Sequence, residues 1–345
     1  MGNLLLDKYE IIRVIGKGGM GMVYEARDVS SGRRVAVKWM HGQSFADDDP
    51  NLLRFQQEAR IAGALDSPHV TAVYECAREP RKEVVFQVME LLRGEDLQSL
   101  LERVGALEPA VALRIAVQAS SGLAAAHRAG VVHRDIKPDN IFLSRSEGET
   151  VVVKLLDFGI AKIRQSKDGN QGMTVPLNSM TSSGEMLGTP LYMAPEQFED
   201  AKNVDARADV YSMGVTMYAM LAGAPPHADS KSFMQILRAI MTGPPPSLLK
   251  HAPWVRPTLA AIVEKTMQSD PKARYANAAE LLEALTKELE GSSDLLEAHL
   301  VGIAAERKFV ARSEVIAETI ADTGSRKAET VPGAKAPWWR KILGG

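Results

Sequence analysis

The segment HRDIKPDN, residues 133–140, carries more information about fold and chemistry than any other part of this sequence. Asp135 offers a carboxylate that can accept or orient a hydroxyl proton, and Lys137 offers a cation that can neutralise charge on a transferred phosphoryl group. Asn140 supplies a neutral oxygen ligand for a divalent cation. Any one of these residues would more often be a solvated surface group, but their combination favours phosphoryl transfer.

The segment LLDFG, residues 155–159, adds an acid that this chemistry needs. Asp157 is a hard anionic ligand that follows a predicted strand directly and precedes a glycine that permits a sharp turn. His133 could suggest general-base chemistry, yet no serine or cysteine nucleophile signature accompanies it. We therefore interpret His133 as a packed structural residue, and the isolated His69 and His227 in the same way.

Three glycines, Gly16, Gly18 and Gly21, form GKGGMG between two predicted strands. Glycine lets a hairpin backbone approach phosphates without an intervening side chain. The same spacing opens dinucleotide-binding folds, and a plain glycine turn is a further alternative. A dinucleotide fold would place a helix directly after the glycines, whereas here MVYEARD leads through a turn at 30–32 into a second strand, VAVKW. The context favours a hairpin that covers phosphates.

Lys38 lies on that second strand among apolar residues, which indicates a charge directed inward at a phosphate rather than a solvated lysine. A buried ammonium group needs an anionic partner, because an uncompensated interior charge is costly. Glu58 is the candidate, on a helix that we expect to begin at Asp49 and Pro50. The alternative is a surface pair between Glu58 and Arg54 one turn earlier.

Between Tyr9 and Val88 short apolar runs alternate with turns, which predicts antiparallel strands. These strands are YEIIRVIG (9–16), MVYEARD (22–28), RRVAVKW (33–39), VTAVYECA (70–77) and EVVFQVME (83–90). Beyond Gly94 helical periodicity dominates, interrupted by one more short strand in VVVKLLDFG (151–159). The predicted helices are ALRIAVQASSGLAAAHRAG (112–130), DVYSMGVTMYAMLAG (209–223), KSFMQILRAIM (231–241), LAAIVEKTM (259–267) and AAELLEALTKELE (278–290).

These patterns predict an α+β fold with a small antiparallel β-rich lobe, which contains one helix, and a larger, mainly helical lobe. A further helix is expected in LLEAHLVGIAAERKFV, residues 295–310, followed by a flexible stretch. The expected divisions are an N-terminal lead (1–8), the two-lobed domain (9–290, with the small lobe at about 9–88, a hinge at about 89–94 and the large lobe at about 95–290) and a C-terminal tail (291–345).

The composition excludes several classes of protein. Among 345 residues, 41 are basic and 43 acidic, so no global electrostatic partner such as nucleic acid is implied. Cys76 is the only cysteine, which excludes an internal disulfide and suits a reducing cytoplasm. The N-terminal residues lack a secretory signal, and no stretch approaches eighteen apolar residues. We expect a cytoplasmic chain without a transmembrane segment.

The motifs GKGGMG, VAVK, Glu58, HRDIKPDN, DFG and YMAPEQ, in that order, resemble those of the eukaryotic-like serine/threonine protein kinases of bacteria. The resemblance covers residues 9 to about 290. It implies a two-lobed protein kinase fold and a signalling enzyme, a non-specific serine/threonine protein kinase. Such an enzyme transfers the γ-phosphoryl of ATP to hydroxyls of proteins with Mg²⁺ or Mn²⁺.

The resemblance also implies roles for individual residues. Lys38 holds the α and β phosphates, Asp135 is the catalytic base assisted by Lys137, and Asn140 and Asp157 bind two magnesium ions. Met89 is the gatekeeper residue, the backbones of Glu90 and Leu92 meet adenine, and Phe142 forms its floor. The full set implied for the nucleotide and its metal is Ile15, Gly16, Lys17, Gly18, Gly19, Gly21, Val23, Ala36, Lys38, Glu58, Met89, Glu90, Leu92, Phe142, Asn140 and Asp157.

Other positions of this sequence also match the family. Asp209 resembles the residue that braces the catalytic loop, and Glu196 with Arg274 resembles a structural ion pair. Lys137 and Thr189 imply a preference for serine and threonine. Two departures are a small residue, Ala62, one turn after Glu58, where we expect looser packing against Phe158, and a long Ser, Thr and Gly-rich segment before Glu196.

Two other functional classes compete with an active kinase. A nucleotide-binding pseudokinase scaffold would lack at least one of Lys38, Asp135, Asn140 and Asp157, and all four are present. A dinucleotide-dependent oxidoreductase rests on the glycines alone, and the strand order after them disfavours it.

Regulation is suggested by Arg134, which precedes Asp135. Its guanidinium group would be energetically unfavourable there without an anionic partner. The segment between Asp157 and Glu196 contains hydroxyl residues that would gain charge on phosphorylation and pair with this guanidinium group. They are Thr174, Ser179, Thr181, Ser182 and Ser183. The family resemblance narrows the choice to Thr181 and Ser183; the alternative is an unmodified, flexible loop that is active as made.

The tail suggests two partners. Trp338 and Trp339 precede Arg340 and Lys341, a pattern that suits peripheral contact with a membrane, although a disordered end or a docking peptide is the alternative. Thr319 could be a phosphothreonine site for a forkhead-associated domain, or a solvated tail threonine.

Overall fold

The computed structural model describes the greater part of the chain, namely residues 4–18, 21–40, 63, 65–79, 84–158, 189–200, 203–230 and 232–304. Two compact units are distinguished, Met1–Ile303 and Ala304–Gly345, and the elements described below belong to the first. The expected helix with Glu58, the candidate phosphosites Thr181 and Ser183, and the tail beyond 304 lie outside the described residues.

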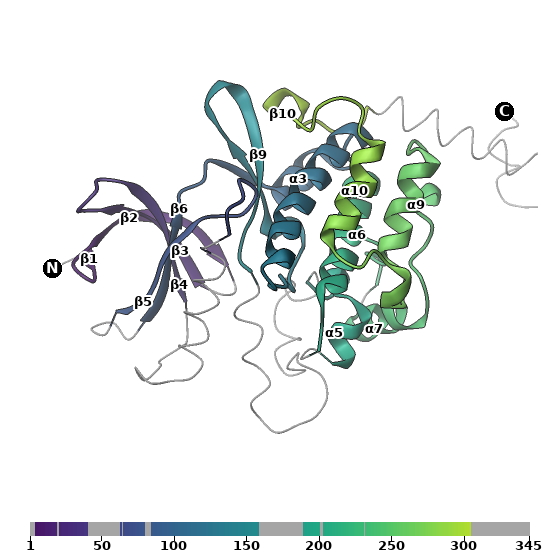
Figure 1. Cartoon of the computed structure of the whole chain (residues 1–345), viewed down its shortest axis with the longest axis horizontal. Helices are drawn as coiled ribbons and strands as arrows, with labels where there is room; N and C mark the ends of the chain where they lie inside the picture. Colours follow the sequence, from purple (N-terminus) through teal and green to yellow (C-terminus); the bar gives the residue numbers. More distant parts are fainter. Residues whose placement is uncertain are drawn as a thin grey trace, which may run out of the picture. The chain divides into compact units, whose positions relative to one another are not determined.

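The N-terminal part forms one antiparallel sheet, drawn in purple to blue in Figure 1, and all five predicted strands are confirmed. The order of its strands is β1-β2-β3-β4-β6-β5. The short strand β1 was not predicted from the sequence. One face buries a cluster that includes Leu5, Val37 and Phe86. The strands are β1 (Leu4–Leu5), β2 (Tyr9–Gly18), β3 (Gly21–Asp28), β4 (Arg34–Met40), β5 (Val73–Glu79) and β6 (Val84–Glu90).

A second, smaller antiparallel sheet, ordered β10-β9-β8-β7, lies against the helices (Figure 1). Its strands are β7 (Gly94–Asp96), β8 (Ile141–Arg145), β9 (Thr150–Leu155) and β10 (Leu295–Leu296). Gly94 has a φ of 143°, and a Cβ atom there would lie 2.0 Å from the carbonyl oxygen of Leu143. Only glycine therefore lets the chain leave the first sheet and pair at once with β8.

The helices make up the larger lobe, as predicted. They are α2 (Leu97–Val104), α3 (Pro109–Arg128), α5 (Pro195–Glu199), α6 (Ala206–Ala222), α7 (Phe233–Thr242), α8 (Leu248–His251), α9 (Pro257–Thr266) and α10 (Ala278–Glu288). Nearly all of α6 is buried, as expected for a helix that is apolar all round. Within the described ranges, no helix is both long and apolar enough to cross a membrane.

The stretch 295–310 differs from the helix that its sequence suggests. Over its described part, the chain forms the two-residue strand β10 and then the 3₁₀ turn η8 (Glu297–His299). The physical reason is tertiary, because Leu295 and Leu296 pair with Val151 and Thr150 at an edge of β9 that would otherwise be open.

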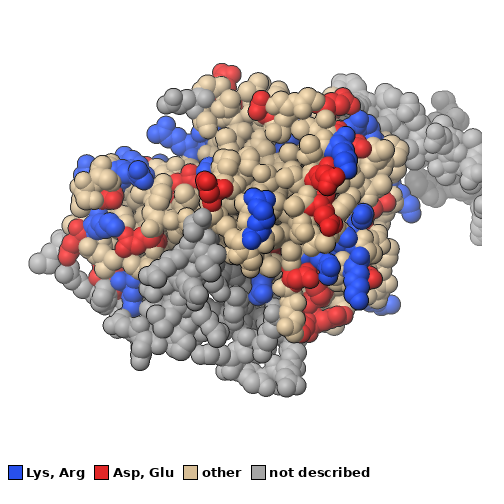
Figure 2. All heavy atoms as spheres, viewed as in Figure 1, with Lys and Arg blue, Asp and Glu red and all other residues tan. Residues whose placement is uncertain are grey.

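Basic and acidic side chains alternate over the described part of the face seen in Figure 2. Neither sign forms a large continuous area there. This mixture agrees with the nearly balanced charge of the sequence.

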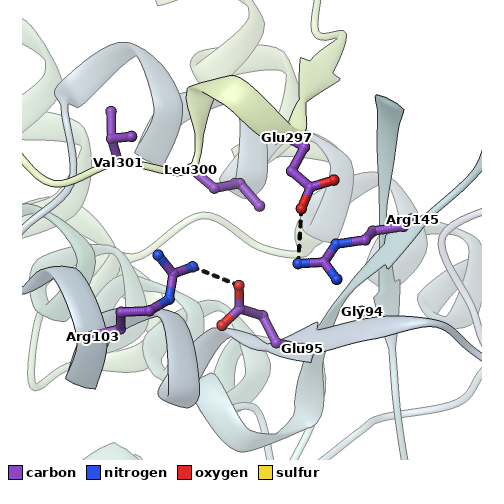
Figure 3. Close-up of a pocket in the computed structure, with 7 residues that line it drawn as sticks. All are labelled: Gly94, Glu95, Arg103, Arg145, Glu297, Leu300 and Val301. Atoms are coloured by element: carbon purple, nitrogen blue, oxygen red, sulfur yellow. Dashed lines mark hydrogen bonds and ion pairs between the residues drawn. The ribbon is translucent and has the colours of Figure 1, made fainter. Parts of the chain in front are cut away.

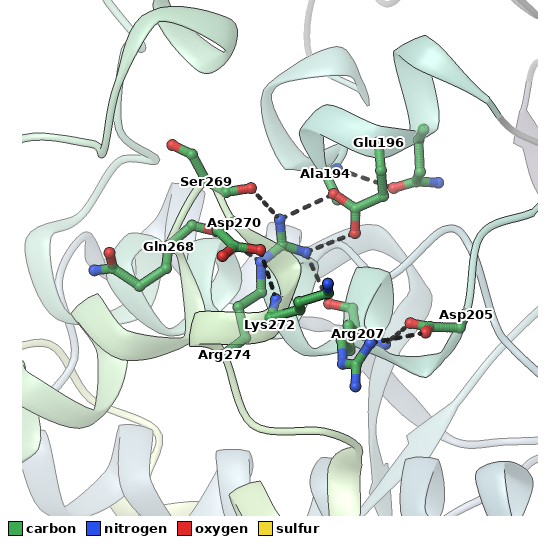
Figure 4. A network of polar contacts seen from close by, with 10 residues as sticks. Ala194, Glu196, Asp205, Arg207, Gln268, Ser269, Asp270, Lys272 and Arg274 are labelled. Carbon is green, nitrogen blue, oxygen red and sulfur yellow. Dashed lines mark hydrogen bonds and ion pairs between the residues drawn. The ribbon is translucent and has the colours of Figure 1, made fainter.

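A buried arginine fixes the start of α5 to the C-terminal half of the helical lobe (Figure 4). Arg274 donates two hydrogen bonds to Glu196, at 2.6 and 2.9 Å, in the fork geometry that favours arginine with carboxylates. The same guanidinium donates to the backbone oxygens of Gln268, Ser269 and Arg207 at 2.7, 3.1 and 3.1 Å. Its side chain is fully buried, so this ion pair is structural.

We expect Arg274→Ala to lower the free energy of unfolding by about 3–5 kcal/mol, because it leaves the Glu196 carboxylate and three carbonyl groups without their donor. Arg256→Ala is the matched control, since Arg256 is half-exposed and pairs with Glu288 and Glu290 at the surface. Its loss should stay within about 1 kcal/mol. Urea unfolding measures both, and equal losses would contradict the structural role of Arg274.

Candidate active site

Lys38 and Asp157, which are 119 positions apart, meet where the two sheets approach each other. Lys38 lies on β4, paired with Val23 of β3 and Gln87 of β6. Its Nζ atom donates to Asp157 Oδ2 at 2.5 Å, and its side chain is almost completely buried. The lysine therefore points inward, as expected for a charge directed at a ligand rather than at solvent.

The loop between α3 and β8 brings together the other predicted catalytic residues. Asp135 is buried, and its Oδ2 atom accepts a hydrogen bond from Asn140 Nδ2 at 3.0 Å. The same amide nitrogen donates to the backbone oxygen of Asp135 at 2.7 Å. Lys137 Nζ lies 3.6 Å from Asp135 Oδ2. A carboxylate, an ammonium group and an amide thus share one small volume.

Asn140 and Asp157 are held near each other by the register of β8 and β9. Ile141 pairs with Leu155, and the Leu156 amide donates to the Asn140 backbone oxygen at 2.9 Å. Asp157 itself has a φ of 43°, in the left-handed region that ordinary residues rarely adopt. Such strain persists only where the surroundings impose it, and it clusters at functional sites.

These two residues fit a divalent cation that is shared with phosphates. Because the amide nitrogen of Asn140 is bonded to Asp135, its amide oxygen is the atom that it can offer to a cation. Within the described ranges, no group of three or more His, Cys, Asp or Glu side chains could hold a metal alone. Mg²⁺ typically takes one or two protein ligands and completes its shell with phosphate oxygens and water.

The predicted nucleotide contacts fall on both sheets. The β2–β3 hairpin pairs Gly16 with Val23, and β4 pairs Ala36 with Met89 of β6. Phe142 lies on β8 of the second sheet. Ile15, Lys17, Gly18 and Gly21 also belong to the hairpin, Glu90 ends β6, Leu92 lies between β6 and β7, and Gly19 is outside the described residues.

The carboxylate of Asp209 holds the backbone of the catalytic loop through hydrogen bonds. This residue of α6 is fully buried, and it accepts hydrogen bonds from the amides of His133 and Arg134, both at 2.7 Å. Arg134 has a φ of 64°, so Asp209 stabilises a left-handed backbone at the residue before Asp135. The resemblance singled out Asp209, and its bonds to the loop are those of a brace.

Two histidines extend this network, and each has a definite tautomer. His127 accepts the Ala278 amide on Nδ1 at 3.1 Å, so its Nε2 carries the proton that bonds to Asp209 at 2.8 Å. His133 likewise accepts the Asp135 amide on Nδ1 and donates from Nε2 to the Leu156 oxygen at 2.7 Å. The His127 ring links α3 to α6 and to the start of α10, and the His133 ring links the catalytic loop to Leu156, so both have a structural role.

Sequence analysis assigned no role to three polar residues that hold this site, Lys154, Gln197 and His127. Lys154 of β9 lies 2.7 Å from Glu90 Oε1, and the same oxygen accepts the Ala72 amide at 2.8 Å. Gln197 donates to the Arg134 backbone oxygen at 3.0 Å. Lys154 and His127 look like ordinary surface or helix residues in the sequence, so no local signal could have identified them, whereas Gln197 is the last residue of the YMAPEQ motif.

His69 stabilises β9 at the edge of the strand that faces away from β8. Burial is the main cause that lowers the pKa of His69, and the neighbouring Lys154 ammonium acts in the same direction. The neutral ring that results pairs through Nδ1 with the Val153 backbone oxygen at 2.9 Å. His69 is therefore structural, as its isolation in the sequence suggested.

A small lobe built on the six-stranded sheet and a larger helical lobe, with the Lys38–Asp157 pair between them, are the arrangement of protein kinase domains. The chain belongs to this family, because the family model described as "Protein kinase domain" matches residues 9–285. Members of the family use ATP and divalent metal ions.

Curated relatives of the chain include bacterial serine/threonine-protein kinases. The chain is 35% identical over 291 residues to the serine/threonine-protein kinase PknB of Mycolicibacterium smegmatis, covering 84% of this chain and 44% of that protein. It is 34% identical over 292 residues to the serine/threonine-protein kinase pkn3 of Myxococcus xanthus, covering 84% and 51%. The chain thus spans about half the length of the curated relatives it matches.

A solved structure is also similar. The Mycobacterium tuberculosis PknI kinase domain matches with a TM-score of 0.59 and 26% identity, over 81% of this chain and 96% of that one. Together these relatives confirm the expected two-lobed kinase fold and the resemblance to bacterial serine/threonine kinases.

We expect Asp209→Asn to lower kcat for phosphoryl transfer by ~10- to 100-fold, because a displaced catalytic loop no longer holds Asp135 in the orientation that the reaction needs. The KM for ATP should change much less, since the side chain of Asp209 bonds to His127 and to the amides of His133 and Arg134, and not to the residues proposed to bind the nucleotide. Steady-state kinetics measures both constants.

The matched control is Asp205→Asn, the same substitution on the same helix. Asp205 is the N-cap of α6 and accepts the Arg207 amide, a role that asparagine performs equally well. Wild-type kcat in both variants would rule out Asp209 as a positioning residue.

Proposed function

We propose that this chain is an ATP-dependent serine/threonine protein kinase, which transfers the γ-phosphoryl of ATP to hydroxyls of protein substrates. The observation that carries the proposal is the convergence of Lys38, Asp135, Asn140 and Asp157 around one site. Family membership and the serine/threonine kinases among its relatives support it.

Each residue has a physical task in this reaction. Lys38 binds phosphate oxygens, for which its buried ammonium group is already directed inward. Asp135 orients and accepts the proton of the attacking hydroxyl, while Lys137 neutralises charge on the phosphoryl group. Asn140 and Asp157 would hold the divalent cation, Mg²⁺ or Mn²⁺, which when bound neutralises charge on the phosphates.

The main alternative is a pseudokinase scaffold that binds nucleotide without transfer. All four polar groups are present, and Asp135 and Asn140 are already bonded to each other. This arrangement supports an active enzyme. Lys137 and Thr189 support serine or threonine as the acceptor.

We expect Asp157→Ala and Lys38→Ala to reduce transfer to a generic protein substrate by at least ~100-fold, because each removes charge that stabilises the phosphates or their metal. Chelation of divalent cations with EDTA should abolish activity. Circular dichroism should show a retained fold. The control is Asp66→Ala, at an exposed position, which should keep the wild-type rate. A wild-type rate in Asp157→Ala or in EDTA would end the assignment.

Regulation by autophosphorylation is a further part of the proposal. Arg134 precedes the proposed catalytic base, Asp135, and among the described residues no carboxylate pairs with its guanidinium group. A phosphate on Thr181 or Ser183 would supply the missing anion through charge-assisted hydrogen bonds. The enzyme would then raise its own activity by ordering the segment before Glu196.

We expect the wild type, after incubation with ATP and Mg²⁺, to carry phosphate at Thr181 or Ser183 and to be several-fold more active than the Thr181→Ala, Ser183→Ala double variant. Mass spectrometry and initial rates measure the two outcomes. Equal activity without phosphate between Ile160 and Gly188 would place regulation elsewhere. The control is Ser230→Ala, outside that segment.

The remaining proposals concern residues 291–345 and location. A family domain that ends at about 290 stands as a proposal, while the compact unit that contains it ends at Ile303. Three further proposals are a cytoplasmic location, suggested by the single Cys76, peripheral membrane contact through Trp338 and Trp339, and a phosphothreonine-reading partner at Thr319. Vesicle binding with and without residues 334–345 tests the membrane contact. Mass spectrometry of Thr319 tests the other partner.

A further inference from the structure

The outer edge of β9, which faces away from β8, is completed by parts of the chain that are distant in sequence. At the end of β9, Leu155 donates its amide to the His69 oxygen at 2.9 Å and accepts the Thr71 amide at 3.0 Å. In the middle, the Val153 amide donates to Gln118 Oε1 at 2.8 Å. An exposed edge of this kind would otherwise pair with other chains or admit water.

The first residues of β9 are covered by a segment that follows the last helix. Residues 292–303, which we call the strap, contain β10, and Leu295 pairs with Val151. The Gln118 side chain is buried and donates from Nε2 to the Ser293 oxygen at 2.9 Å. Gln118 thus links β9 to the strap, because its two amide atoms bond to one each.

The strap packs as part of the core. Leu295, Leu300 and Ile303 are buried. Its end lies against the corner between α2 and α3, where Ile303 donates its amide to the Ala106 oxygen at 2.8 Å. A Cβ atom on Gly302 would lie 2.3 Å from the Val104 oxygen, so this approach needs glycine. These contacts are those of a fixed element rather than of a loose tail.

Charge contributes little to this attachment. Glu297 of the strap faces Arg145 at the end of β8, 2.9 Å away, beside a cavity that Glu95 and Arg103 also line (Figure 3). Both side chains of the Glu297–Arg145 pair are about half-exposed, which limits such a pair to a small contribution. The buried leucines and the backbone pairing with β9 hold the strap.

The strap acts on the site through β9. One residue, Leu156, separates the end of β9 from Asp157, and the pairing of β9 with β8 sets the relative position of Asn140 and Asp157. A β9 whose first half loses its outer partner can slip or fray, and a shift there moves one proposed metal ligand against the other. The register at the site therefore depends on contacts at the far end of the strand.

We propose that the strap and Gln118 are positioning elements that hold β9, and with it Asp157, for binding of nucleotide and metal. The functional unit then extends to Ile303, beyond the family match that ends at residue 285. Only the part of this inference that concerns nucleotide and metal rests on the proposed function.

The test compares three leucine-to-alanine variants of the full chain. Leu295→Ala removes the buried strap contact, Leu296→Ala alters the exposed neighbour on the same strand, and Leu259→Ala removes an equally buried leucine on α9. Amide hydrogen exchange is measured without nucleotide, and the Kd of a non-hydrolysable ATP analogue with Mg²⁺ is measured by calorimetry. Thermal unfolding reports the general loss of stability.

We expect Leu295→Ala to accelerate exchange from Val151 to Asp157 by about tenfold and to raise the Kd several-fold. Leu259→Ala should lower the unfolding temperature about as much as Leu295→Ala does, by roughly 5 °C or more. It should change neither the exchange rate of β9 nor the Kd. Leu296→Ala should resemble the wild type. Unchanged β9 exchange in Leu295→Ala, or the same pattern in Leu259→Ala, would overturn the proposal.

A second variant covers the case in which Leu295→Ala does not fold. Gln118→Leu replaces the amide in α3 with an apolar side chain of similar size and removes both hydrogen bonds, so it should give the same local exchange and the same rise in Kd. Wild-type exchange in this variant would equally overturn the inference. If the wild type binds no nucleotide, the proposed function fails, while the exchange data still decide whether the strap holds β9.

Discussion

The buried carboxylate of Asp209 is the interaction on which the catalytic loop depends. It satisfies the amides of His133 and Arg134, the second of which has a left-handed backbone, and it also bonds to His127. Without this acceptor, two buried amides would lose their partner, and the strained conformation before Asp135 would relax. The position of Asp135, the proposed catalytic base, therefore follows from a residue on α6, about 75 positions later in the sequence.

Polar links between distant segments also place the other half of the site. Glu90, at the end of the first sheet, bonds to Lys154 of the second, three residues before Asp157. Lys38 reaches Asp157 itself across the same boundary. Each sheet thus contributes a charged side chain to the other, so the nucleotide and metal residues are arranged as one group although they lie on separate elements.

The sequence was informative wherever chemistry imposes a fixed local spacing. The motifs around Asp135 and Asp157 and the alternation in β2 to β6 predicted the class of fold and the residues that converge. The helix expected over 295–310 was wrong over its described part, because leucines at helical spacing also fit a strand, and only the distant open edge of β9 selects between them. His127, Lys154 and Gln118 escaped prediction for the same reason: their partners lie more than 30 positions away.

The pairing of β10 with β9 has a consequence for the order of events during synthesis. About 145 residues separate Val151 from Leu295, so this contact closes one of the longest loops in the domain, and it cannot form until the end of α10 has left the ribosome. Until then β9 exposes half an unpaired edge, a surface that recruits other strands. Nascent chains that pause before residue 295 should therefore aggregate more readily and depend on chaperones. The exposure of this edge ends when the strap, the last dozen residues of the compact unit, pairs with β9.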